Sequence, residues 1–114
     1  MLAIALGVGS SLPVRADSIG IGFASVRAAY SALSARSDAE VEQDAEWTRI
    51  AVPGPEGLAV WSFASRAHPA YPVLVRRDVA LRNGVPTLVT RFLCEGRRTA
   101  CETLYADVRS DARI

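Results

Sequence analysis

The chain has 114 residues, of which 50% are hydrophobic, and its 13 basic and 12 acidic residues give a formal net charge of +1 at pH 7. This length allows one domain with a modest core and leaves no room for a second domain. Nucleic acid, which demands many cationic contacts with phosphates, is a poor candidate partner because the chain has no basic tail and its adjacent arginines are only Arg76-Arg77 and Arg97-Arg98.

The first 16 residues have the pattern of a secretory signal peptide. An apolar run is followed by Pro13, and Val14-Arg15-Ala16 suits cleavage after Ala16. The run is too short to span a bilayer, which needs about 20 apolar residues. We therefore expect a signal peptide at 1–16, a single domain at 17–114 with a formal net charge of zero, a periplasmic or secreted location, and no transmembrane segment.

A first helix is predicted over Ser25–Arg36. Phe23, Val26, Tyr30 and Leu33 recur at helical spacing, and Ser25 is placed to act as the N-cap with Phe23 packing back from the position ahead of it. The following segment, 37–46, is acidic and polar. It predicts a solvated loop with room for at most a short edge strand.

Two strands are predicted next, at Trp47–Val52 and Leu58–Phe63. The turn residues Pro53-Gly54-Pro55-Glu56-Gly57 join them into a hairpin. The segment Ala67–Pro72 follows, and its two prolines restrict both themselves and the residues before them to extended conformations. We expect a stiff loop there.

A second hairpin is predicted from Val73–Arg82 and Val85–Leu93, because Asn83-Gly84 between two β-rich runs is the strongest short hairpin signal. A two-residue turn also sets the register, which predicts these opposing pairs: Arg82 and Val85, Val79 and Leu88, Arg77 and Thr90, Val75 and Phe92, Val73 and Cys94. One face of the hairpin is then apolar, interrupted by Arg77 and Thr90. The other face carries Arg76 opposite Arg91, with Asp78 one step along.

A last helix follows, with Thr99 and Glu102 spaced as a capping box, or with Arg97 and Arg98 already helical. Its apolar stripe is Cys101, Leu104, Tyr105, Val108 and Ala112. Strand alternation and helical periodicity each place one cysteine toward the core. We predict a disulfide between Cys94 and Cys101, with free buried thiols as the alternative if the chain is not exported. Two cysteines and one histidine cannot supply four zinc ligands, so neither a metal nor a cofactor is expected.

These elements predict an α+β fold: a helix, a four-stranded antiparallel sheet and a second helix, with both helices packed on one face of the sheet and one disulfide.

Aromatic and proline residues are concentrated between Trp61 and Pro72. Aromatic side chains beside a stiff loop lose little entropy on binding and suit a recognition surface. The competing and favoured interpretation is internal packing, in which Tyr71 and the prolines cover Trp61 or Phe63 as a lid on the core. Arg77, on an otherwise apolar face, needs a carboxylate or a ligand. The candidate binding residues are therefore Trp61, Phe63, His68, Tyr71 and Arg77.

An enzymatic alternative centres on His68. This residue could act as a general base for Ser62 or Ser65 with Asp78 as orienter, although no Gly-x-Ser-x-Gly elbow is present. The alternative is that His68 is an ordinary loop residue that hydrogen-bonds to nearby backbone. No residue is assigned as catalytic.

Several segments resemble a group of small exported, periplasmic proteins of unknown function from Gram-negative bacteria. The segments are Trp61-Ser62-Phe63, His68–Pro72, Val75-Arg76-Arg77, Leu93-Cys94-Glu95 and Ala100-Cys101, about half of the expected mature chain. The resemblance implies export and a disulfide, and it transfers no functional residues.

The function predicted from the sequence is that of a non-enzymatic periplasmic binding or accessory protein, of inhibitor or adaptor type, which recognises its partner through Trp61–Pro72. The expected partner is an envelope protein or a small apolar ligand. The alternatives are a small hydrolase centred on His68 and a carrier that holds an apolar molecule between the helices and the sheet.

Overall fold

A computed structural model describes residues 20–54 and 57–110, so the predicted signal peptide at 1–16 lies outside the described residues. The elements in chain order are α1 (Val26–Ser34), β2 (Glu40–Gln43), β3 (Trp47–Gly54), β4 (Gly57–Ala64), β5 (Val73–Arg82), β6 (Val85–Cys94) and α2 (Arg98–Ser110). No helix in this part of the chain is long and apolar enough to cross a membrane.

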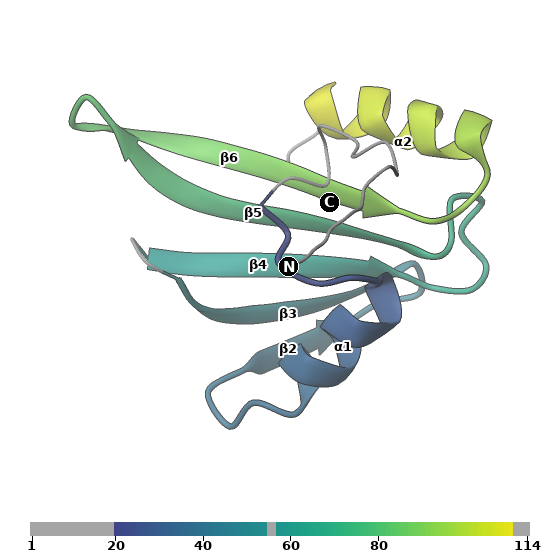
Figure 1. Ribbon diagram of the computed structural model, residues 1–114, viewed down its shortest axis with the longest axis horizontal. Coiled ribbons are helices and arrows are strands. Elements are labelled where there is room, and N and C mark those ends of the chain that lie inside the picture. Colours follow the sequence, from purple (N-terminus) through teal and green to yellow (C-terminus); the bar gives the residue numbers. More distant parts are fainter. Residues whose placement is uncertain (1–19, 55–56, 111–114) are drawn as a thin grey trace, which may run out of the picture.

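The five strands form one antiparallel sheet in the order β2-β3-β4-β5-β6, so that neighbours in the chain are neighbours in the sheet (Figure 1). The predicted register of β5 and β6 is confirmed at every pair, from Arg82 opposite Val85 to Val73 opposite Cys94. Asn83 and Gly84 both have positive φ angles, of 53° and 78°. This is the conformation that a tight turn joining twisted strands requires and that asparagine and glycine tolerate best.

The prediction of a four-stranded sheet is wrong, because residues 40–43 form a fifth strand, β2. All four residues of β2 are exposed, and β2 pairs along one side only, with Glu42 opposite Arg49 of β3. Backbone hydrogen bonds and cross-strand pairs hold such an edge strand in place without burying side chains. Strand β2 therefore lacks the alternation of apolar and polar residues that identifies a strand in a sequence.

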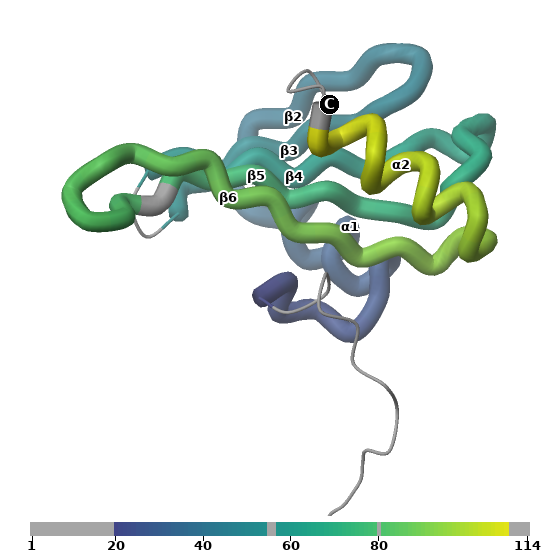
Figure 2. Tube along the Cα trace, turned by 90° about the horizontal axis from the view of Figure 1, so that it is seen from above, coloured from purple at the N-terminus to yellow at the C-terminus, as the bar shows by residue number. Residues whose placement is uncertain are grey.

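The two helices lie on opposite faces of the sheet (Figure 2), which corrects the prediction that they share one face. Helix α1 packs on Ile50, Trp61, Phe63 and Leu74, whereas α2 packs on Trp47, Val73, Val75 and Cys94. The reason is that the central strands carry apolar side chains on both faces. In β5, for example, Leu74 points to α1 while Val73 and Val75 point to α2. Each apolar face needs its own helix to exclude water.

Helix α1 starts as predicted, because Ser25 is its N-cap and the Ser25 Oγ accepts a hydrogen bond from the Ala28 N–H at 3.0 Å. Helix α2 starts without the predicted capping box. It begins at Arg98, so Thr99 lies inside the helix rather than at its N-cap, and Glu102 forms an ion pair with Arg98 at 3.5 Å. The predicted apolar stripe of α2 faces the sheet as far as Val108, and Ala112 lies outside the described residues.

The predicted disulfide between Cys94 and Cys101 is confirmed, with 6.0 Å between the two Cα atoms. Both cysteines are buried in the cluster of apolar side chains between α2 and the sheet. The bond therefore ties the end of β6 to the first turns of α2.

Replacing both cysteines, as Cys94→Ser with Cys101→Ser, should lower the free energy of unfolding by about 2–3 kcal/mol, since the bond closes a short loop in the unfolded chain. Urea denaturation followed by far-UV circular dichroism measures the change. Wild-type protein with its disulfide reduced is the matched control and should be destabilised similarly. An unchanged urea midpoint in both samples would show that the bond contributes nothing to stability.

Candidate functional site

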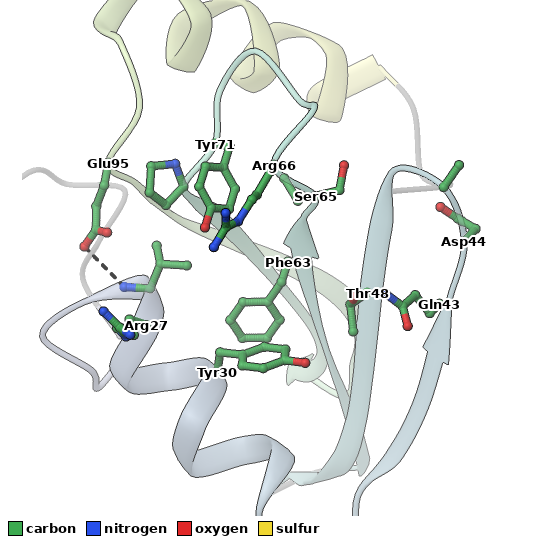
Figure 3. A pocket seen from close by; sticks show the side chains of 14 residues that line it. Arg27, Tyr30, Gln43, Asp44, Thr48, Phe63, Ser65, Arg66, Tyr71 and Glu95 are labelled. Carbon is green, nitrogen blue, oxygen red and sulfur yellow. Dashed lines mark hydrogen bonds between the residues drawn. The ribbon is translucent and has the colours of Figure 1, made fainter.

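A cleft of about 850 Å³ opens between the first turns of α1, the turn that joins β2 to β3, and the loop 65–72 that joins β4 to β5 (Figure 3). Its residues thus come from segments that lie far apart in the sequence. The floor is formed by Phe63 and Thr48 from the centre of the sheet, and Glu95 closes the end nearest to α2.

The start of α1 is anchored to the end of β6 by Glu95. The Glu95 carboxylate accepts a hydrogen bond from the Val26 N–H at 3.2 Å, drawn as a dashed line in Figure 3. The first N–H groups of a helix have no partner within the helix and carry a partial positive charge, so a carboxylate placed there is stabilising. This bond joins residues 69 positions apart and sets the width of the cleft at that end.

Three aromatic rings, from Phe63, Tyr30 and Tyr71, form the apolar part of the cleft. Phe63 is only 5% exposed and forms the floor, and the Tyr30 ring meets it edge to face at 5.2 Å between ring centroids. Tyr30 is 44% exposed, although it shares the helical spacing of Val26 and Leu33, which are buried. Its position at the border of the α1 core stripe leaves one side of the ring in the cleft. Tyr71, 41% exposed, supplies a third ring from the loop 65–72.

The loop 65–72 is held by hydrogen bonds within its own backbone, which form two successive turns. The His68 N–H donates to the Ser65 carbonyl at 3.0 Å, and the Tyr71 N–H donates to the His68 carbonyl at 3.1 Å. Ala70 is completely buried and lies directly against Gly96, where a Cβ atom would overlap the Ala70 carbonyl. Gly96 therefore allows the loop to approach the β6–α2 turn closely.

The opposite rim is organised by Asp44. Its carboxylate accepts hydrogen bonds from the Glu46 and Trp47 N–H groups at 2.8 and 2.9 Å and from the Arg49 guanidinium at 2.7 Å. Together, the bond from Arg49 and the two backbone N–H groups lower the pKa of Asp44 to about 2. Asp44 is thus ionised at neutral pH and already fully engaged.

Two arginines in the cleft have no ion-pair partner among the described residues. The two carboxylates that line the cleft have other contacts: Asp44 pairs with Arg49, and Glu95 accepts a hydrogen bond from the start of α1. In residues 20–54 and 57–110, no carboxylate forms an ion pair with Arg27 or Arg66, which both line the cleft and are exposed. The site is therefore an aromatic cleft with a cationic rim.

The structure brings two of the five predicted binding residues, Phe63 and Tyr71, into this cleft. Trp61 lies in the core, 5% exposed, with Arg76 over its ring at 5.0 Å and Phe23 edge to face at 5.6 Å. Arg77 is on the opposite face, where it is buried and donates to the Val108 carbonyl at 3.3 Å. It thereby helps to hold α2 on the sheet.

His68 is also directed away from the cleft. Its Nδ1 accepts a hydrogen bond from the Ala70 N–H at 3.0 Å, and its ring packs against Trp47 at 5.2 Å. Asp78, the proposed orienter, lies on the α1 face of β5 and pairs with Arg76 and Arg91 at 3.3 and 3.7 Å. The hypothetical triad is therefore not assembled. In the described part of the chain, no cluster of three or more potential metal ligands occurs.

Reasoning from the sequence did not identify Arg27, Arg66 or Asp44 as site residues, and it used Tyr30 only to predict the first helix. Each of these residues is unremarkable within its own segment. Their common location follows only from the packing of α1 and two loops around one end of the sheet.

Trp61→Ala should lower the free energy of unfolding by about 3–5 kcal/mol because it empties a core site. Tyr71→Ala, at the rim of the cleft, should lower the free energy of unfolding by about 1 kcal/mol or less. Urea denaturation followed by far-UV circular dichroism compares the two variants. Equal losses of unfolding free energy in the two variants would contradict the placement of Trp61 in the core and of Tyr71 at the cleft.

The Asp44 turn should respond to acid. Because the pKa of Asp44 is about 2 in the folded protein and 3.8 for an unperturbed aspartate, its stabilising contribution is complete above about pH 4 and is lost as the pH falls toward 2. The amide NMR signals of Glu46 and Trp47 should titrate near pH 2. Glu42→Gln, a control on the neighbouring strand, should leave this titration unchanged, whereas Asp44→Asn should abolish it. Titration near pH 4 would show that the carboxylate is not engaged.

No protein-family model, curated protein or solved structure matches this chain. The resemblance to small exported proteins therefore stays a prediction, and the function is argued from the geometry of the cleft.

Proposed function

We propose that the protein is a non-enzymatic binding or accessory protein of the periplasm, of inhibitor or adaptor type, which holds a segment of an envelope protein in the cleft between α1 and the loop 65–72. The observation that carries this proposal is the presence, in one cleft, of an aromatic floor and of two arginines without a carboxylate partner among the described residues.

This combination favours a partner segment in which an acidic residue lies next to an apolar one. Phe63, Tyr30 and Tyr71 offer apolar surface to the second residue. Arg27 and Arg66 offer guanidinium groups, whose forked geometry matches a carboxylate. Of the two acidic residues that line the cleft, Asp44 is paired with Arg49, and the Glu95 carboxylate is hydrogen-bonded to the start of α1. Neither carboxylate therefore occupies Arg27 or Arg66.

The rigidity of the cleft supports binding as its role. The loop 65–72, the Asp44 turn and the start of α1 are each held by hydrogen bonds within the protein. A preorganised site loses little conformational entropy when a ligand enters, so that more of the contact energy is available for affinity.

The same geometry disfavours the two alternative functions. A hydrolase centred on His68 lacks its orienter, since Asp78 is held by two arginines on the other face of the sheet. A carrier of a purely apolar molecule calls for an enclosed apolar cavity. The cleft instead has exposed charged residues at its rim. The periplasmic location rests on the signal-like residues 1–16 and on the disulfide, which persists in oxidising compartments.

Affinity capture from a periplasmic extract tests the proposal. The oxidised protein is immobilised, and captured proteins are identified by mass spectrometry. A variant carrying Arg27→Ser and Arg66→Ser should bind its partner about tenfold more weakly, since two charge-assisted hydrogen bonds are lost. Tyr71→Ala should weaken binding severalfold, and added salt should weaken the wild-type complex.

A variant carrying Arg97→Ser and Arg109→Ser is the matched control. It loses the same charge from exposed positions on or beside α2, outside the cleft. Equal weakening by the control and by the cleft variant would reduce the effect to net charge and contradict the proposal. Capture of no protein above the level seen with an empty matrix would also contradict it.

A further inference from the structure

The far end of the β5–β6 hairpin extends beyond the rest of the sheet. Pairing between β4 and β5 ends at Ala59 opposite Asp78, whereas pairing between β5 and β6 continues to Arg82 opposite Val85. Figures 1 and 2 both show this end projecting past the other strands. A two-stranded ribbon without a neighbour is marginally stable in water.

Exposed apolar side chains gather at this projecting end. Of the eight large hydrophobic residues that are exposed in the described part of the chain, four lie here, Val79, Leu81, Val85 and Leu88, and a fifth, Leu58, lies in the neighbouring strand β4. The register places Val79, Leu81 and Leu88 on the face that carries α2, beyond the contact of Arg77 with Val108. A contiguous apolar surface of this kind is typical of an interaction site.

In residues 20–54 and 57–110, no strand pairs with the outer edge of β6. Proteins normally shield an edge strand by keeping it short or by placing charges on it. The opposite edge, β2, does both, with four residues of which two are glutamates. Strand β6 has ten residues, and its only charged one, Arg91, pairs with Asp78.

The backbone of β6 offers hydrogen-bonding groups along this edge. Because the two-residue turn makes Arg82 and Val85 a hydrogen-bonded pair, the groups of Thr87, Val89 and Arg91 point toward β5. Those of Leu88 and Thr90 point away from the sheet. Pro86 also occupies an outward position, where its carbonyl can accept a hydrogen bond but it has no N–H to donate, so it removes one donor from this edge.

We propose that β6 pairs antiparallel with β6 of a second copy of this chain, which forms a symmetric dimer with a continuous ten-stranded sheet. A second copy is the occupant that these features fit, because segment 85–90 carries no charge and can lie against itself without repulsion. Pairing centred on Leu88 places it against the partner's Leu88 and places Arg91 against the partner's Val85. Val79, Leu81 and Leu88 of both copies then lie on the same face of the joined sheet, and the interface is isologous.

Analytical ultracentrifugation of the oxidised full chain tests the proposal. The mass should rise from one chain toward two between about 10 µM and 1 mM protein. Leu88→Lys should raise the dimer dissociation constant at least tenfold, as a charge at the centre of the pairing would repel its copy. Leu58→Lys is the matched control, because Leu58 is equally exposed on the same face, at 57% against 54% for Leu88, but lies in β4. It should leave dimerisation unchanged.

Hydrogen exchange of the wild-type protein gives a second measurement that depends on no variant. The Leu88 and Thr90 amides should exchange more slowly at high than at low protein concentration, while the amides of β2 should not change. A mass of one chain throughout the range would overturn the proposal. Equal weakening by Leu88→Lys and Leu58→Lys, or exchange of the Leu88 and Thr90 amides that does not depend on concentration, would overturn pairing through β6.

Discussion

The two-residue turn at Asn83-Gly84 sets the register of β5 and β6, and through it the face of the sheet on which each side chain of this hairpin lies. A shift of one residue would reverse every side chain. With the observed register, Val73, Val75 and Cys94 form the surface on which α2 packs, and Leu74 joins the surface on which α1 packs. The positions of both helices therefore depend on this turn.

The segment that follows β6 then connects the two faces of the sheet. Within three residues, Cys94 bonds to α2, Glu95 accepts a hydrogen bond from the start of α1, and Gly96 allows Ala70 to approach. These contacts hold both helices and the loop 65–72 relative to one end of the sheet. The cleft exists because this junction is rigid, so the disulfide supports the site without touching a ligand.

The two surfaces that we assign to binding lie at opposite ends of β5. The cleft lies near the start of β5, which follows loop 65–72, and the projecting hairpin lies at its end. Ten residues of extended strand separate them by roughly 30 Å. Dimerisation through β6 would therefore leave the cleft of each copy open, and two clefts on one dimer could hold two partner segments.

Local rules in the sequence determined the helix N-cap at Ser25, both hairpins, the register of the second hairpin and the disulfide, because each depends on residues close together in the chain. For the site, the sequence singled out Phe63 and Tyr71 through the aromatic and proline content of their segment. Only the tertiary structure decided that the helices lie on opposite faces, that β2 joins the sheet, and that Arg27, Tyr30, Arg66 and Asp44 meet at one cleft. These features depend on which apolar face each helix covers and on side chains brought together from distant segments, and neither leaves a periodic pattern in the sequence.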